Sequence, residues 1–120
     1  MSHFSHFLAA TSNSWRGLVA IARSEKAFQQ ELVALAIGIP LAFYVADGAW
    51  RRVALIGVLL LVLIVELLNT GLEKLADLIT RERHQTIGWV KDMGSAAVAL
   101  SLLLAGLVWL AAIADRLGLL

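Results

Sequence analysis

The sequence contains no cysteine, which excludes disulfide bonds and thiolate metal sites. Charged residues make up only 16% of the chain and its net charge is +1, so it lacks the basic surface of a nucleic-acid-binding domain. No glycine precedes a lysine, and neither a glycine-rich kinase loop nor a His-Arg-Asp triplet is present, which excludes the common ATP-binding folds. Residues 1–13 lack a basic region followed by an apolar core, so no cleaved signal peptide is expected.

Apolar residues are abundant instead. They form 60% of the 120-residue chain, and the mean hydropathy is +0.82. Soluble domains are nearer to about 45–50% apolar, and a chain of this length cannot hide the excess in its own core. The composition therefore predicts a single all-α domain embedded in a membrane.

Three apolar segments are candidates for membrane spans. Residues 32–46 would form a helix of only about 22 Å, so they span the bilayer only if the amphipathic residues 27–30 continue the same helix. A second segment begins at Val53 and extends to about residue 80, roughly 40 Å, so its last turns should protrude from the ~30 Å hydrocarbon core. Residues 93–114 carry no charge and form the clearest span. The expected elements are a surface helix at about 5–25 and spans at about 28–47, 52–80 and 90–115.

The surface helix and the orientation follow from where tryptophan and the basic residues lie. Residues 14–23 mix tryptophan, aliphatic residues and arginine, a composition typical of a helix that lies on the membrane surface. Seven basic residues fall in the N-terminal region and the second connection, and three (Arg51, Arg52 and Arg116) fall on the opposite side. The positive-inside rule then predicts a cytoplasmic N-terminus and a periplasmic C-terminus.

Glu66 is the most informative single residue. It follows the uninterrupted apolar run 53–65, where a charged side chain costs at least ~2.5–3.5 kcal/mol. On a helix, Glu66, Glu73 and Asp77 share one stripe, with Asn69 and Thr70 on its flanks. A helix that only spanned the membrane would be more stable without this stripe, so Glu66 is a candidate functional residue.

Polar residues of the other spans are expected at the same membrane boundary. Glu25 and Glu31 precede the first span, and Lys91, Asp92 and Ser95 begin the third. Carboxylates at an aqueous edge bind hard cations such as Mg²⁺, a lysine neutralises phosphate charge, and a deeper carboxylate can accept a proton from a hydroxyl. This combination suits phosphoryl transfer from a nucleotide to a lipid alcohol. The pattern alone leaves two alternatives open, a buried carboxylate paired for helix assembly and a proton or ion pathway.

Several motifs resemble one family. Residues 66–73 read Glu-Leu-Leu-Asn-Thr-Gly-Leu-Glu, Glu82-Arg83-His84 follows, and residues 91–98 read Lys-Asp-Met-Gly-Ser-Ala-Ala-Val. With Ser14-Trp15-Arg16-Gly17-Leu18 and residues 25–31, they are similar to the prokaryotic integral-membrane diacylglycerol kinases over about residues 14–108. The resemblance implies a homotrimer of chains with one surface helix and three transmembrane helices, with active sites between subunits. It implies transfer of phosphate from MgATP to 1,2-diacylglycerol, giving phosphatidic acid in the inner membrane.

The resemblance also assigns roles by position. Glu66 corresponds to the general base and Asn69 to a residue that supports the catalytic site, while Glu25 and Glu73 correspond to the metal ligands. The positions implied to bind ATP are Glu25, Glu73, Glu82, His84, Lys91 and Asp92. The positions implied to contact the lipid substrate are Ser14, Trp15, Ala27, Phe28, Gln30, Glu31, Glu66 and Ser95.

Two positions depart from the family pattern. His6 stands where an arginine that contacts both substrates is common, and Asn13 stands where a tyrosine is usual. The related undecaprenol kinases share the Glu-x-x-Asn-x-x-x-Glu element and the Lys-Asp pair. Residues 93–96 and 28–31 favour diacylglycerol as the acceptor over undecaprenol.

Overall fold

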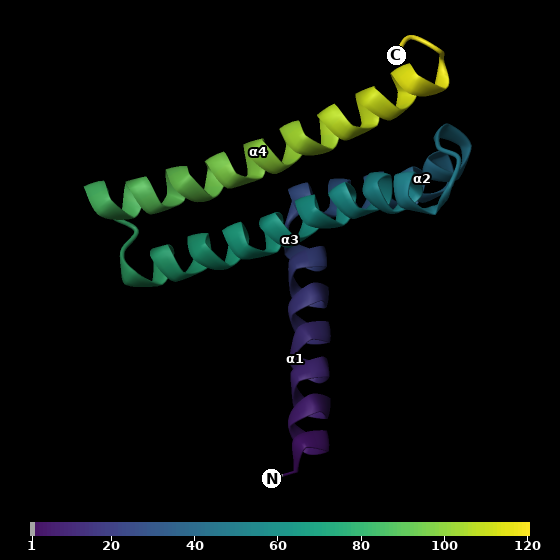
Figure 1. Cartoon of the computed structure of the whole chain (residues 1–120). Coiled ribbons are helices and arrows are strands. Elements are labelled where there is room, and N and C mark those ends of the chain that lie inside the picture. Colours follow the sequence, from purple (N-terminus) through teal and green to yellow (C-terminus); the bar gives the residue numbers. More distant parts are fainter. Residues whose placement is uncertain (1) are drawn as a thin grey trace.

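The computed structural model describes residues 2–120 and is all-helical over that range. Its helices are α1 (His3–Ser24), α2 (Lys26–Val45), α3 (Ala49–Ile79) and α4 (Gln85–Arg116). Helix α3 packs against both α2 and α4, whereas α1 touches mainly α2 and projects across the direction of the other helices (Figure 1). This arrangement suits a surface helix followed by three spans.

The helices α2, α3 and α4 are each long and apolar enough to cross a membrane. Helix α2 begins at Lys26, so residues 27–30 do continue the first span, as its short apolar run required. Helix α3 has 31 residues and α4 has 32, which correspond to roughly 46 and 48 Å, longer than the ~30 Å hydrocarbon core. The α3–α4 hairpin therefore extends beyond the start of α2, as Figure 1 shows.

The connections have local causes. Glu25 adopts an extended conformation that ends α1, and the Gln29 side chain donates a 2.8 Å hydrogen bond to the free carbonyl of Ala22. Gly48 has φ +91°, a conformation that favours glycine, in the turn between α2 and α3. The Arg52 guanidinium donates to the Ala46 carbonyl at 3.0 Å and covers the end of α2. The first connection thus turns the chain from α1 into the bundle, and the second brings α3 back alongside α2.

Buried apolar residues form two small clusters. Ile21, Phe28 and Leu63 meet where α1, α2 and α3 come together. Ala42, Ala46 and Leu55 pack near the opposite end of the bundle. Most other large apolar side chains are exposed, which is expected for surfaces that face lipid or a further subunit.

The end of the bundle far from α1 holds the three basic residues that the sequence places on the side opposite the N-terminus. Arg51 forms a 3.0 Å ion pair with Asp115, linking α3 to α4. The Arg52 guanidinium lies 4.7 Å from the centre of the Phe43 ring, and that of Arg116 lies 5.5 Å from the centre of the Tyr44 ring. Asp115 thus offsets one positive charge at this end, and the two aromatic rings stabilise the other two guanidinium groups.

Candidate active site

Glu66 lies on the buried face of α3, with 8% of its surface exposed. Leu63, one turn deeper into the membrane, belongs to the apolar cluster with Phe28 and Ile21. The carboxylate therefore sits directly above an apolar floor, at the level where α1 joins the bundle. The sequence predicts that Glu66 lies at or below the cytoplasmic interface, because it follows the apolar run 53–65.

Three other carboxylates lie near enough to Glu66 to interact with it electrostatically. Electrostatic repulsion acts between the carboxylate of Glu66 and those of Glu73 and Glu25, and between Glu31 and Glu66. Glu25 and Glu31 lie at the start of α2, and Glu66 and Glu73 lie in the C-terminal half of α3. Acidic side chains from two helices thus lie near one another within a single chain, whereas Lys91 and Asp92, which the sequence also placed at this boundary, do not join them.

Two of these carboxylates have polar partners. Lys74 Nζ lies 3.6 Å from Glu25 Oε1, and Asn69 Nδ2 donates to Glu73 Oε1 at 3.4 Å. Both contacts are long for strong hydrogen bonds, so neither carboxylate is tightly held. Glu25 and Glu73 can therefore exchange these partners for a cation.

Two buried oxygens of the site lack hydrogen-bond partners. They are Glu31 Oε2 and Asn69 Oδ1. Among residues 2–120, no other buried side-chain nitrogen or oxygen lacks a partner. A buried acceptor without a donor costs about 1–3 kcal/mol, which a bound ligand would recover. Within the described chain no three acidic or histidine side chains are close enough to enclose a metal ion. The oxygen donors fit a divalent ion held by two carboxylates and completed by phosphate and water, as is usual for Mg²⁺.

Helix α4 approaches the site through Gly94. Gly94 is buried, and a Cβ atom at this position would overlap the Asn69 side chain, so only glycine fits here without displacing Asn69. The backbone of α4 consequently forms one wall around the Asn69 amide. This close approach links the Lys-Asp-Met-Gly motif to the Asn-x-x-x-Glu motif.

The remaining predicted nucleotide contacts lie along the α3–α4 hairpin. Lys91 Nζ forms a 2.7 Å ion pair with Asp77 Oδ1, and Asp92 is exposed. His84 caps α4 by accepting from Ile87 N, and Glu82 lies in the connection before it. The end of α3 is about 20 Å from Glu66, so this chain does not bring Glu82 and His84 to the carboxylate group. They line a polar hollow with Arg81, Arg83, Ile87, Gly88 and Lys91.

The predicted lipid-contacting residues divide into two sets. Trp15 and Phe28 line an apolar hollow of about 310 Å³ between α1 and α2, next to the Glu66 level. Glu31 lies beside Glu66. The second set is exposed and does not line this hollow; its members are Ser14, Ala27, Gln30 and Ser95. The Ser14 hydroxyl donates to the Ala10 carbonyl of its own helix at 2.9 Å.

Comparison with known proteins identifies the family. The model described as "Prokaryotic diacylglycerol kinase" matches residues 12–113. The chain belongs to the prokaryotic diacylglycerol kinase family. It is 41% identical to the diacylglycerol kinase of Escherichia coli (strain K12) over 106 residues, which cover 88% of this chain and 87% of that protein.

Other bacterial relatives agree. The chain is 40% identical over 102 residues to the diacylglycerol kinase of Pseudomonas aeruginosa, covering 85% of this chain and 83% of that one. It is 38% identical over 104 residues to that of Haemophilus influenzae, covering 87% and 88%. Membership makes this protein an enzyme, a lipid kinase that uses ATP with a divalent metal. Its three apolar helices and bacterial relatives indicate a multi-pass protein of the inner membrane.

Sequence reasoning did not place Lys74 and Asp77 in the site. Lys74 contacts Glu25, and Asp77 holds the kinase's Lys91. The sequence showed Asp77 on the acidic stripe of α3. Its pairing with Lys91 could not be predicted, because it depends on how the connection 80–84 places α4 against α3. The two departures from the family pattern lie on the exposed surface of α1, where Asn13 accepts a hydrogen bond from Arg16.

Proposed function

We propose that this kinase transfers the γ-phosphoryl group of MgATP to 1,2-diacylglycerol, giving phosphatidic acid and ADP. The carrying observation is the nearly buried Glu66, which lies above an apolar floor and beside three carboxylates at the level of α1. A carboxylate at this level can reach a hydroxyl group in the headgroup region of a lipid, which is where diacylglycerol carries its hydroxyl. All the relatives named above are diacylglycerol kinases, which favours this acceptor over undecaprenol.

Glu66 acts as the general base in this proposal. The lipid hydroxyl oxygen bonds to the γ-phosphorus as the bond from that phosphorus to the β–γ bridging oxygen breaks, and ADP leaves. Glu66 takes the hydroxyl proton, for which its depth and its apolar floor are suited. Asn69 supports the site through its weak hydrogen bond to Glu73.

Glu25 and Glu73 would hold the Mg²⁺ ion that accompanies the nucleotide. When bound, the ion neutralises phosphate charge, which is the main electrostatic requirement of phosphoryl transfer. Glu25 must then leave Lys74, whose ammonium is freed to face the phosphates. Lys91, Asp92, Glu82 and His84 are proposed to contact the nucleotide along the hairpin; they are exposed or half-buried here and accessible to it.

The orientation and the assembly are also part of the proposal. Water-soluble ATP is in the cytoplasm, so the Glu66 end of the bundle faces the cytoplasm, the N-terminus lies there too, and the C-terminus is periplasmic. The exposed apolar faces and the distance between Glu82 and Glu66 within one chain support sites completed by neighbouring subunits. The number of three subunits follows the family resemblance.

One assay tests the proposed acceptor. The purified, detergent-solubilised protein is given labelled ATP with diacylglycerol and undecaprenol together, and the lipid products are separated by thin-layer chromatography. We expect labelled phosphatidic acid as the main product. Predominant undecaprenyl phosphate, or no labelled lipid, would contradict the proposal.

A further inference from the structure

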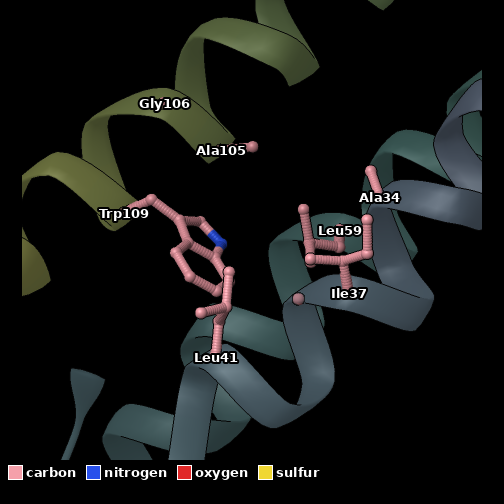
Figure 2. A pocket seen from close by; sticks show the side chains of 8 residues that line it. Ala34, Ile37, Leu41, Leu59, Ala105, Gly106 and Trp109 are labelled. Atoms are coloured by element: carbon pink, nitrogen blue, oxygen red, sulfur yellow. The ribbon is translucent and has the colours of Figure 1, made fainter. Parts of the chain in front are cut away.

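Two of the larger hollows of the structure differ in their chemistry. The hollow between α2 and α4, bordered by Leu41, Leu59 and Trp109, contains no charged side chain (Figure 2). The hollow on the C-terminal half of α3 is polar and has a volume of about 430 Å³; it is lined by Lys74, Asp77, Leu78 and Arg81. Its two cations, Lys74 and Arg81, lie outside the motifs that indicate the family.

Lys74 stands between this polar hollow and the carboxylates. Its ammonium lies 3.6 Å from Glu25 Oε1, and no other lysine or arginine of residues 2–120 forms an ion pair with Glu66 or the three carboxylates near it. The neighbouring Asp77 is already paired with Lys91 at 2.7 Å. Because the other carboxylates repel that of Glu66, Lys74 supplies the one direct positive partner that this acidic group has within the described chain.

The contact of Lys74 occupies a proposed metal ligand. Glu25 and Glu73 are the carboxylates proposed to hold Mg²⁺, so a divalent ion that enters alone must displace Lys74 from Glu25. The displaced ammonium would have no free acidic partner beside it, because Lys91 holds Asp77. Phosphates in the polar hollow would give the ammonium a new charged partner. The cost of displacing Lys74 is therefore recovered only when metal and nucleotide bind together.

We propose that Lys74 couples metal binding to nucleotide binding: it occupies Glu25 in the free enzyme, which weakens the binding of a metal ion alone, and it moves to the nucleotide phosphates when MgATP binds. The proposal rests on the kinase function proposed above and assigns a regulatory consequence to the exchange of Glu25. The ion pair is weak enough to open, since the Lys74 and Glu25 side chains are 65% and 34% exposed. A lysine suits the exchange because its ammonium moves on a flexible four-carbon stem.

Lys74→Met tests the exchange, because methionine keeps an unbranched side chain but carries no charge. Lys26→Met is the matched control: Lys26 is exposed, follows Glu25 in the sequence and forms no ion pair within residues 2–120. Lys74→Arg keeps the positive charge. Two dissociation constants are measured on the assembled protein in detergent without a lipid acceptor, that of Mn²⁺ alone by electron paramagnetic resonance and that of the magnesium complex of a non-hydrolysable ATP analogue by equilibrium dialysis.

We expect opposite changes in the two constants. Lys74→Met should bind Mn²⁺ alone about two- to five-fold more tightly, because Glu25 is released, and this gain should vanish when Glu25→Gln is added. The same variant should bind the nucleotide complex about five-fold or more weakly, because the phosphates lose a cation. Lys74→Arg should stay close to the unsubstituted protein, and Lys26→Met should change neither constant by more than about two-fold.

Unchanged Mn²⁺ affinity in Lys74→Met, unchanged affinity for the nucleotide complex, or equal changes in Lys26→Met would each overturn the proposal. Failure of the proposed function is seen separately, because neither constant requires turnover. An unsubstituted protein that phosphorylates no lipid would refute the proposed function, while the two binding constants would still decide whether Lys74 couples metal to nucleotide.

Discussion

Gly94→Ala should impair the kinase although Gly94 carries no functional group. The added methyl group would overlap the Asn69 side chain, which is itself 8% exposed and enclosed by α3 and α4. Either Asn69 or the α4 backbone must move by about 1 Å, and overpacking of this kind costs about 1–3 kcal/mol of stability. The hydrogen bond from Asn69 to Glu73, already 3.4 Å long, would be lost.

The effect on turnover follows from this displacement. A displacement of about 1 Å in an active site lowers rates by up to about 100-fold, so with Asn69 in its proposed supporting role we expect kcat for phosphatidic acid formation to fall by about 10–100-fold. Gly71→Ala is the control, because its Cβ position is open and alanine favours a helix by up to about 1 kcal/mol. It should retain normal turnover and equal or higher thermal stability.

A double-substitution cycle separates this mechanism from general misfolding. If the overlap with Asn69 is the cause, Gly94→Ala should destabilise the Asn69→Ala background by less than it destabilises the unsubstituted protein, since the smaller side chain leaves room. The measurement is the detergent unfolding midpoint of all four proteins. Equal destabilisation in both backgrounds, together with normal turnover of Gly94→Ala, would refute the reasoning.

Three further predictions concern other parts of the kinase. Trp109→Phe removes the hydrogen bond to the Leu55 carbonyl and should lower the free energy of unfolding by about 1 kcal/mol, measured by denaturation in detergent. Arg51→Gln breaks the ion pair with Asp115. The side chains of the two residues are 66% and 45% exposed, so the free energy of unfolding should change by less than about 1 kcal/mol and turnover should stay normal. A large loss of either would contradict this. Removal of divalent ions by a chelator should abolish turnover and added Mg²⁺ should restore it, because carboxylate oxygens are the proposed ligands; activity that survives chelation would contradict the metal assignment.

The sequence predicted the helical architecture well because the spans are long and their apolar runs are uninterrupted. The extension of the first span through residues 27–30 followed from the thickness of the bilayer alone, and α2 confirms it. The depth of Glu66 in the bilayer stays a prediction, made by counting residues along one helix. The approach of Glu25 and Glu31 to α3 is what antiparallel spans allow, whereas the expectation that Lys91 and Asp92 would join them is not met within this chain.

The packing around α4 could not be predicted in this way. Helix α4 is apolar on nearly all faces, so its sequence does not indicate which face meets α3. The contact of Gly94 with Asn69 and the pairing of Lys91 with Asp77 depend on that rotation. The family pattern includes Gly94 but does not show that its backbone encloses the amide of Asn69.

Replacement of Glu66 by glutamine tests the central claim most directly. The variant keeps the size and the hydrogen-bonding capacity of the side chain but cannot accept the hydroxyl proton. Initial rates of phosphatidic acid formation are compared in the same micelles, with the oligomeric state checked by cross-linking. We predict a loss of about 10²–10⁴-fold in kcat with the assembly intact. Turnover within a few-fold of normal in a correctly assembled Glu66→Gln variant would show that Glu66 is not the general base.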